Sequence, residues 1–151
     1  MLDDVFHYEP PMMARYEVDL EPAGEAIFDE LDTDAQEDVI QCVGNKLNVP
    51  KDDVLKRLRG KRIPVYLVDP TTLIGDSGRD VRTEDVNQYG EMLSDDLTSM
   101  PPVVINTKDM EYPLCEGGHR TVGAIQAGLP RIYAIDVAKA YIHGDEIRFR
   151  R

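Results

Sequence analysis

Five consecutive residues offer the clearest chemistry in this sequence: Glu116, Gly117, Gly118, His119 and Arg120. A short apolar run precedes them, and small and apolar residues at helical spacing follow them. This pattern predicts a strand, a glycine turn and a helix, because glycine lets the chain turn abruptly and leaves room for a ligand. The first amides of a helix lack partners within it and lie at its positive end, so the turn is suited to hold a phosphate group.

Two arginines strengthen this interpretation. Arg120 lies in the first turn of the helix, where a positive side chain opposes the helix dipole unless an anion lies opposite it. Arg79 lies in the polar segment 75–80, among two glycines and two acids. Such segments are usually only connections, yet this one could contact a ligand. We therefore include Arg79 among the candidate ligand-binding residues.

Several helices and strands must position the turn. We expect helices where apolar residues recur at helical spacing behind capping residues such as Asp32 and Thr83, and strands where short apolar runs lie between turn residues. The expected helices cover residues 33–47, 50–58, 83–97 and the stretch after the turn, and the expected strands cover residues 63–68, 103–105, 112–115 and 132–137.

The two ends of the chain are less regular. Residues 1–14 predict a loosely attached lead-in, and residues 15–20 predict an edge strand that ends at a turn over residues 21–24. A short helix is expected over residues 25–31. Residues 140–149 predict a hairpin around His143.

Acidic residues gather in the first quarter of the chain. The 151 residues carry a formal net charge of −12. Residues 1–38 hold 13 Asp and Glu against Arg15 alone, and the rest of the chain holds equal numbers of acids and bases. Because DNA is bound mainly by neutralising its phosphates, an acidic arm on a neutral remainder argues against direct DNA binding. The arm could be a solvated surface, fold over a basic site or imitate a polyanion for a partner.

Composition also bears on location and on the cysteines. A hydrophobic content of 42% is enough for a core, and no apolar run approaches membrane-spanning length. With no signal-peptide pattern at its start, the chain is expected to be cytoplasmic. Cys42 and Cys115 form neither a disulfide framework nor a zinc motif, and Cys42 lies on an apolar helical stripe, which favours a buried thiol. His7 and His143 have no matching partners in the sequence and are expected at the surface.

In this order, the elements from about residue 63 to residue 137 resemble the ParB/sulfiredoxin superfamily. The resemblance covers half of the chain and rests on four features: an apolar strand that ends in Asp69-Pro70, the helix from Thr83, the run Pro101-Pro102-Val103-Val104-Ile105, and the Glu-Gly-Gly-His-Arg turn with its helix. It implies an α+β fold, a small mixed sheet with flanking helices. This domain would span residues 61–151, after an acidic, mainly helical extension over residues 1–60.

The resemblance also implies a nucleotide site at the turn. Gly117, Gly118, His119 and Arg120 would line the phosphates, and Thr121 would add an amide or a hydroxyl. In the His-Arg branch, which includes an ADP-dependent serine kinase and nucleotide hydrolases, the shared chemistry is phosphoryl transfer.

Three residues would then act on the reacting phosphate. Arg120 would neutralise developing charge, His119 would donate to a phosphate oxygen or act as an acid, and Glu116 would be the nearest base. Structural roles remain open for all three. Glu116 could accept amide bonds or pair with Arg120, and His119 could serve as a hydrogen-bonding group at the helix N-terminus.

Departures from the family pattern narrow the expected reaction. Partition-type ParB proteins carry a Gly-Glu-Arg-Arg box with a further Arg two residues on, and Gly118, His119 and Val122 replace three of those charged residues. Cytidine triphosphate hydrolysis and DNA clamping of that kind are therefore not expected. Sulfiredoxin has its nucleophilic cysteine at the position of Gly118, so sulfinic acid repair loses its nucleophile unless Cys115 substitutes for it.

Two functions remain. The first is a nucleotide-binding enzyme that transfers or hydrolyses a phosphate, with ATP or ADP favoured over CTP. Mg²⁺ could be recruited by the phosphates together with Glu116, Asp76 or Asp80, although no spacing demands a metal site. The second is a non-catalytic module that keeps the phosphate cradle as part of its fold and binds a protein through residues 1–60. Nuclease activity is a weaker third function, because the acidic arm counts against it.

Overall fold

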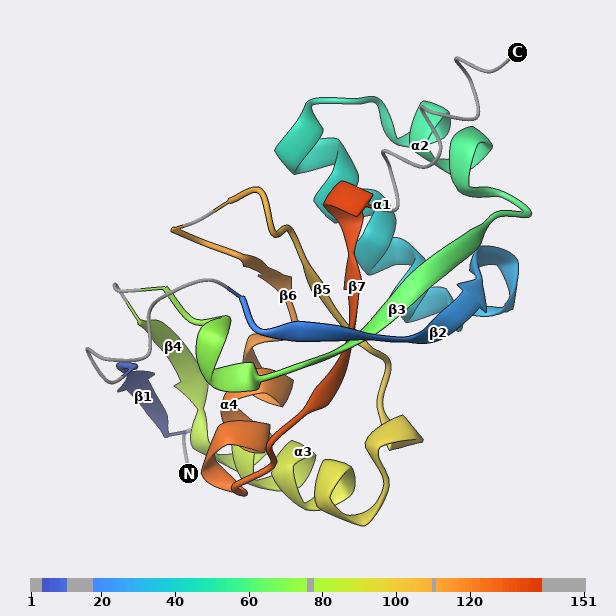
Figure 1. The fold of residues 1–151 in the computed structure, drawn as a ribbon. Helices are drawn as coiled ribbons and strands as arrows, with labels where there is room; N and C mark the ends of the chain where they lie inside the picture. Colours follow the sequence, from blue (N-terminus) through green and yellow to red (C-terminus); the bar gives the residue numbers. More distant parts are fainter. Residues whose placement is uncertain (1–3, 11–17, 76–77, 110, 140–151) are drawn as a thin grey trace.

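A mixed sheet forms the centre of the protein (Figure 1). The computed structural model describes residues 4–10, 18–75, 78–109 and 111–139. Within these residues the sheet has the strand order β2–β3–β7–β5–β6, in which β5 runs parallel to β7 and the other neighbours are antiparallel. The strands are β2 Leu20–Ile27, β3 Arg62–Val68, β5 Val103–Ile105, β6 Leu114–Glu116 and β7 Ile132–Asp136. The expected α+β fold with a small mixed sheet is confirmed.

The central strands are covered on both faces. Val103, Val104 and Ile105 of β5 are all buried, as expected of a β-branched run inside a two-sided sheet. Because side chains alternate along a strand, Val104 packs in one apolar cluster, whereas Val103 and Ile105 pack in the other. The sheet therefore separates two cores, each closed by a pair of helices.

The first pair of helices is α1 Thr33–Leu47 and α2 Lys51–Leu58. The Asp32 carboxylate caps α1 by accepting from the Ala35 amide at 2.8 Å. The apolar stripe of α1, which includes Val39 and Val43, is buried against the sheet in the core that also contains Val104. Both helices were expected from the sequence, and both are confirmed.

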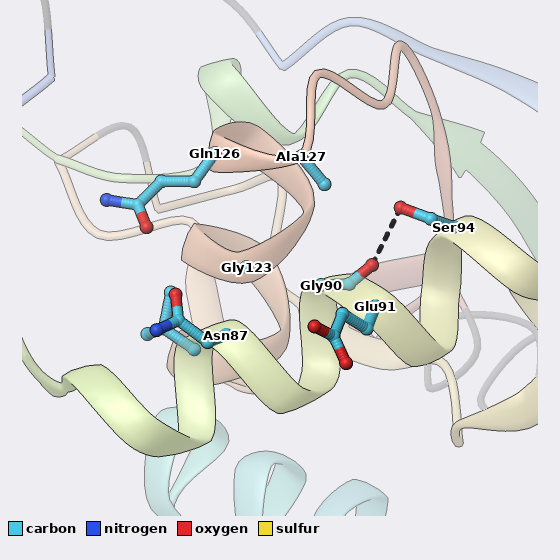
Figure 2. A pocket seen from close by; sticks show the side chains of 8 residues that line it. Asn87, Gly90, Glu91, Ser94, Gly123, Gln126 and Ala127 are labelled. Carbon is cyan, nitrogen blue, oxygen red and sulfur yellow. Dashed lines mark hydrogen bonds between the residues drawn. The ribbon is translucent and has the colours of Figure 1, made fainter.

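The opposite face carries α3 Thr83–Asp95 and α4 Gly118–Gln126. These helices approach each other at Gly90 and Gly123, where a Cβ on Gly123 would lie 2.7 Å from the Val86 carbonyl oxygen. Figure 2 shows this crossing, with the Ser94 hydroxyl donating to the Gly90 carbonyl at 2.8 Å. Thr83 begins α3, but no side chain in the described residues caps this helix, and α3 ends before Leu97. We expected Thr83 to cap this helix and the helix to reach residue 97, and the structure differs on both points.

A second, two-stranded sheet holds residues that were expected to be irregular. Its antiparallel strands, β1 Val5–Tyr8 and β4 Arg79–Arg82, pair Tyr8 with Arg79. We expected residues 1–14 to be a lead-in and residues 75–80 to be a loop, so both expectations were wrong in part. The two segments order each other through backbone pairing, which short-range patterns do not contain.

The first quarter of the chain also differs from expectation. Residues 21–27 form most of β2 instead of a turn and a helix, with a bulge between Pro22 and Gly24 that absorbs the turn-forming residues. A 3₁₀ turn, Phe28–Glu30, takes the place of the rest of the expected helix. We expected residues 1–60 to form an acidic, mainly helical extension. In the structure β2 pairs along β3, and Phe28 and α1 share a core with Val104.

Some expectations fall outside the described residues. The hairpin over residues 140–149 and the first part of the strand expected over residues 15–20 belong to this group. No helix in the described part of the chain is long and apolar enough to cross a membrane.

Candidate functional site

The glycine turn joins β6 to α4 through a backbone conformation that favours glycine. Gly117 has φ 110° and ψ 30°, and a Cβ there would lie 2.6 Å from Val103 Cγ1. The Thr121 amide makes the first helical bond, to the Gly117 carbonyl at 2.8 Å. Among the described residues no side chain caps α4. The amides of Gly118, His119 and Arg120 are therefore those that a helix leaves without an internal partner.

Arg79 lies across the first residue of α4. A Cβ on Gly118 would lie 2.5 Å from Arg79 Nε and 3.0 Å from Arg79 Cδ. The arginine thus occupies the space that a side chain at position 118 would need. Strand β4 places this charge at the positive end of α4, where it is favourable only if an anion or a carboxylate compensates it.

Arg120 is held by the protein itself. Its Nη1 donates to the carbonyls of Pro101 and Pro102 at 2.6 and 3.1 Å, and its Nη2 lies 3.5 Å from an Asp38 carboxylate oxygen. Only 11% of the side chain is exposed. Burial raises the pKa of Asp38, and the charge of Arg120 opposes that rise. Arg120 therefore ties α4 to α1 and to the segment before β5.

The surroundings of His119 favour its neutral form. Its Nε2 accepts a hydrogen bond from the Arg82 amide at 3.0 Å, so the ring proton lies on Nδ1. Burial lowers the pKa of His119, and the charges of Arg82 and Arg79 lower it further, whereas Asp85 raises it. The side chain can donate a hydrogen bond from Nδ1, but it is poorly suited to act as an imidazolium acid at neutral pH.

An open cleft of about 500 Å³ lies at the start of α4. The residues Glu116 to Arg120 and Arg79, all expected from the sequence, line it together. The charged side chains in the lining are Asp34, Asp38, Asp80, Glu116, Arg79 and Arg120. Carboxylates thus outnumber guanidinium groups, and both signs of charge face the same space.

Thr121 does not line this cleft. It is fully buried, and its amide already bonds to Gly117. Its hydroxyl has no hydrogen-bond partner among the described residues. The expectation that Thr121 adds a hydroxyl or an amide to a phosphate site therefore has no support from this geometry. Asp76, a candidate Mg²⁺ ligand, lies outside the described residues.

The structure adds cleft residues that sequence reasoning missed. Asp34 and Asp38 come from α1, Tyr89 comes from α3, and Met100 and Pro101 precede β5. Their contributions depend on how the helices pack on the sheet, and no local pattern indicates that. The sequence held one signal for Asp34 and Asp38, namely the acidic character of the first quarter of the chain. One of the alternatives left open for this acidic arm was that it folds over a basic site.

His7 lies at the surface, as expected, but it does have a partner. Its Nδ1 lies 2.6 Å from an Asp80 carboxylate oxygen, so this histidine has a partner that the sequence did not indicate. The pairing of β1 with β4 places His7 opposite Asp80 in register. The contact positions one of the carboxylates that line the cleft.

A second groove, of about 550 Å³, lies where α3 and α4 cross. Its lining includes Asn87, Glu91 and Gln126 (Figure 2). None of the residues expected to bind a ligand belongs to this groove. Among the described residues, no group of three or more His, Cys, Asp or Glu side chains is arranged to hold a metal ion.

Comparisons with known proteins do not identify the chain. No family model, no curated protein and no solved structure matches it. The resemblance to the ParB/sulfiredoxin superfamily therefore remains a prediction from the motif and the order of its elements.

Proposed function

We propose that the cleft at the start of α4 binds a nucleotide complexed with Mg²⁺. The observation that carries the proposal is the turn itself: Gly117, Gly118 and His119 line a cleft of about 500 Å³ at the start of α4, beside Arg79. Backbone amides at a helix N-terminus form an anion-binding site. A nucleotide is the phosphate ligand that the resemblance to the His-Arg branch favours, with ATP or ADP preferred over CTP.

The charges in the cleft favour the Mg²⁺ complex over the bare nucleotide. Among the described residues, four carboxylates and two guanidinium groups line the cleft, so a free polyphosphate would meet an excess of negative charge. Magnesium is bound through one or two carboxylates plus substrate phosphates in many nucleotide sites. Asp80 is the carboxylate we assign to the cation, which leaves Glu116 as the candidate base.

Phosphoryl transfer or nucleotide hydrolysis is the proposed reaction at this site. Glu116 is the candidate base. His119 would donate from Nδ1 to a phosphate oxygen, because its Nε2 is already bonded to the Arg82 amide. Arg120 would stabilise charge mainly by holding the turn in place, since two proline carbonyls and Asp38 engage its guanidinium group. A cytoplasmic location, where such nucleotides are abundant, is part of this proposal.

A thermal-shift panel tests the binding step. ATP, ADP, CTP and GTP are each compared with and without Mg²⁺, and excess EDTA serves as the metal-free control. We expect the melting temperature to rise with ATP or ADP in Mg²⁺, because a ligand that binds only the folded state stabilises it. No shift with any nucleotide would contradict the proposal.

A second candidate function is a non-catalytic module that binds a basic protein partner. It is favoured by the acidic side chains exposed on and beyond β2, which include Glu21, Glu25, Asp29 and Glu30. Nucleotide binding without turnover would favour this function, and Mg²⁺-dependent phosphate release that disappears in a Glu116→Gln variant would favour the enzyme. Direct DNA binding is not proposed, because the same acidic surface would repel it.

A further inference from the structure

The two cysteines of the chain meet beneath the cleft. Cys42 lies on α1 and Cys115 lies on β6, and neither forms a disulfide bond. A hydrogen bond joins the two thiols. Cys42 is only 4% exposed, whereas Cys115 is partly exposed and packs against the apolar cluster that contains Cys42. The packing of α1 on the sheet therefore brings together two thiols that are far apart in the sequence.

We propose that Cys42 and Cys115 form a reversible intramolecular disulfide when the protein meets a peroxide. The two side chains share one apolar cluster, Cys42 is hydrogen-bonded to Cys115, and the disulfide would join α1 to β6. Close approach of the two side chains is one of the geometric requirements for a disulfide.

The two thiols have different parts in the reaction. The hydrogen bond to Cys115 and burial both raise the pKa of Cys42 well above its ordinary value, so Cys42 remains a thiol at neutral pH. Cys115 is the more exposed of the two residues, and in this proposal it is the one that a peroxide oxidises first. The thiolate is the nucleophile in such oxidations, and exposure favours reaction.

The proposed chemistry balances in two steps. The Cys115 thiolate attacks one oxygen of hydrogen peroxide, the O–O bond breaks, and Cys115 becomes a sulfenic acid while hydroxide leaves and takes up a proton to form water. The Cys42 sulfur then attacks the Cys115 sulfur, the S–O bond breaks, and the oxygen leaves as a second water with the Cys42 proton. Two thiols are oxidised to one disulfide, and one peroxide is reduced to two waters.

The position of the pair connects it to the cleft. Cys115 directly precedes Glu116, and Cys42 lies one helical turn after Asp38. Glu116 and Asp38 both line the cleft. A disulfide would therefore fix two walls of the cleft relative to each other. The proposal does not depend on which ligand the cleft binds.

Peroxide treatment of the full-length native protein tests the proposal. Intact mass spectrometry is expected to show the loss of the mass of two hydrogen atoms, and thiol titration is expected to fall from two free thiols per chain towards none. Peptide mapping should find Cys42 linked to Cys115 in the monomer, and dithiothreitol should restore both thiols. Retention of both free thiols, a gain of oxygen atoms without cross-linking, or cross-linking only between chains would each overturn the proposal.

Two single variants supply the controls. In Cys42→Ala, peroxide should add oxygen atoms to Cys115, because no neighbouring thiol remains to resolve the sulfenic acid. In Cys115→Ala, the buried Cys42 should stay unmodified under the same treatment. Equal oxidation of Cys42 in Cys115→Ala would contradict the assignment of Cys115 as the sulfur that reacts first.

Discussion

At the scale of single residues, contacts within the protein already engage two of the candidate ligand-binding side chains. Arg120 is engaged by two proline carbonyls and Asp38, and His119 Nε2 is engaged by the Arg82 amide. Among the described residues that line the cleft, Arg79 and the first amides of α4 are the positive groups that remain for a ligand. The turn therefore acts through backbone geometry first and through charged side chains second.

Gly117→Ala should destabilise the protein by about 2–4 kcal/mol, because a side chain must adopt positive φ and also displaces packed atoms. In this protein φ is 110° and the nearest atom to a new Cβ would be Val103 Cγ1, at 2.6 Å. Urea denaturation measures the loss. Gly128→Ala is the matched control, since Gly128 also has positive φ, 76°, but no atom lies within 4 Å of its Cβ position. Equal losses in both variants would contradict the clash with Val103.

His119 should titrate with a pKa below its ordinary value of 6.5, because burial disfavours the imidazolium and the Arg82 amide bonds to the neutral ring. An NMR titration of the imidazole protons gives this pKa directly, and the denatured protein should return it to about 6.5. Since the unfolded state binds the proton more readily, stability should fall as the pH drops from about 6.5 through the lower folded pKa. A folded pKa above 6.5 would contradict the Nε2 contact.

At the scale of elements, α3 and α4 form the layer that carries the turn. Their close approach requires small residues, since the Cβ of an alanine at position 90 would lie 2.8 Å from the Gly123 carbonyl oxygen. Backbone atoms cannot move aside as a flexible side chain can. The position of the α4 N-terminus thus depends on two glycines in the middle of helices.

Gly123→Ala should cost about 1–3 kcal/mol even though alanine favours a helix, because overpacking outweighs the gain in propensity. Its Cβ would lie 2.7 Å from the Val86 carbonyl and 2.9 Å from the Gly90 amide nitrogen. The control is Gly44→Ala in α1, where the nearest atom, the Val49 carbonyl oxygen, is 3.2 Å away. Thermal denaturation should rank the Gly123 variant below the Gly44 variant. The reverse order would contradict the tight crossing of α3 and α4.

The sequence predicted the elements whose signals are local. The apolar stripe predicts helix α1, and the β-branched run predicts strand β5. Both patterns can be recognised without knowledge of the rest of the chain. Strand β2 was missed because Pro22 and Gly24 are typical of turns, whereas here they lie at a bulge. Strands β1 and β4 were missed because each depends on the other across a long sequence separation.

Prediction of the candidate site was limited in the same way, because some of its contacts join segments that are far apart in the sequence. The turn and Arg79 were predicted from residue type and spacing, and they do line one cleft. Asp38, Tyr89 and the contact between Cys42 and Cys115 arise only when α1 and α3 pack on the sheet. The family resemblance assigned Thr121 to the phosphate site, but the rotation of the helix places its side chain in the core.

At the scale of the whole molecule, one sheet unites the acidic first part of the chain with the remainder. Phe28 is fully buried and packs in the core that contains Val104 and Ile135. Removal of residues 1–60 would therefore expose one face of the sheet. We expect the two parts to unfold together.

Phe28→Ala should lower the stability of the entire described fold by about 3–5 kcal/mol, as is typical of a buried phenylalanine. Calorimetry should show one unfolding transition at a lower temperature. Tyr112→Ala, which removes an aromatic side chain that is 51% exposed, should change stability by much less. Two separate transitions, of which only the first moves in Phe28→Ala, would contradict a shared core.

The most direct test of the central claim is calorimetric titration of ATP and ADP, each with Mg²⁺, into the native protein and into Arg79→Ala. We predict binding to the native protein and an affinity at least about tenfold lower in Arg79→Ala, since hydrogen bonds to charged groups contribute about 1.5–3 kcal/mol. Arg82→Ala, on the same strand but paired with Asp85, should keep nearly native affinity. Absence of binding to the native protein, or equal affinity in Arg79→Ala, would contradict a phosphate site at the start of α4.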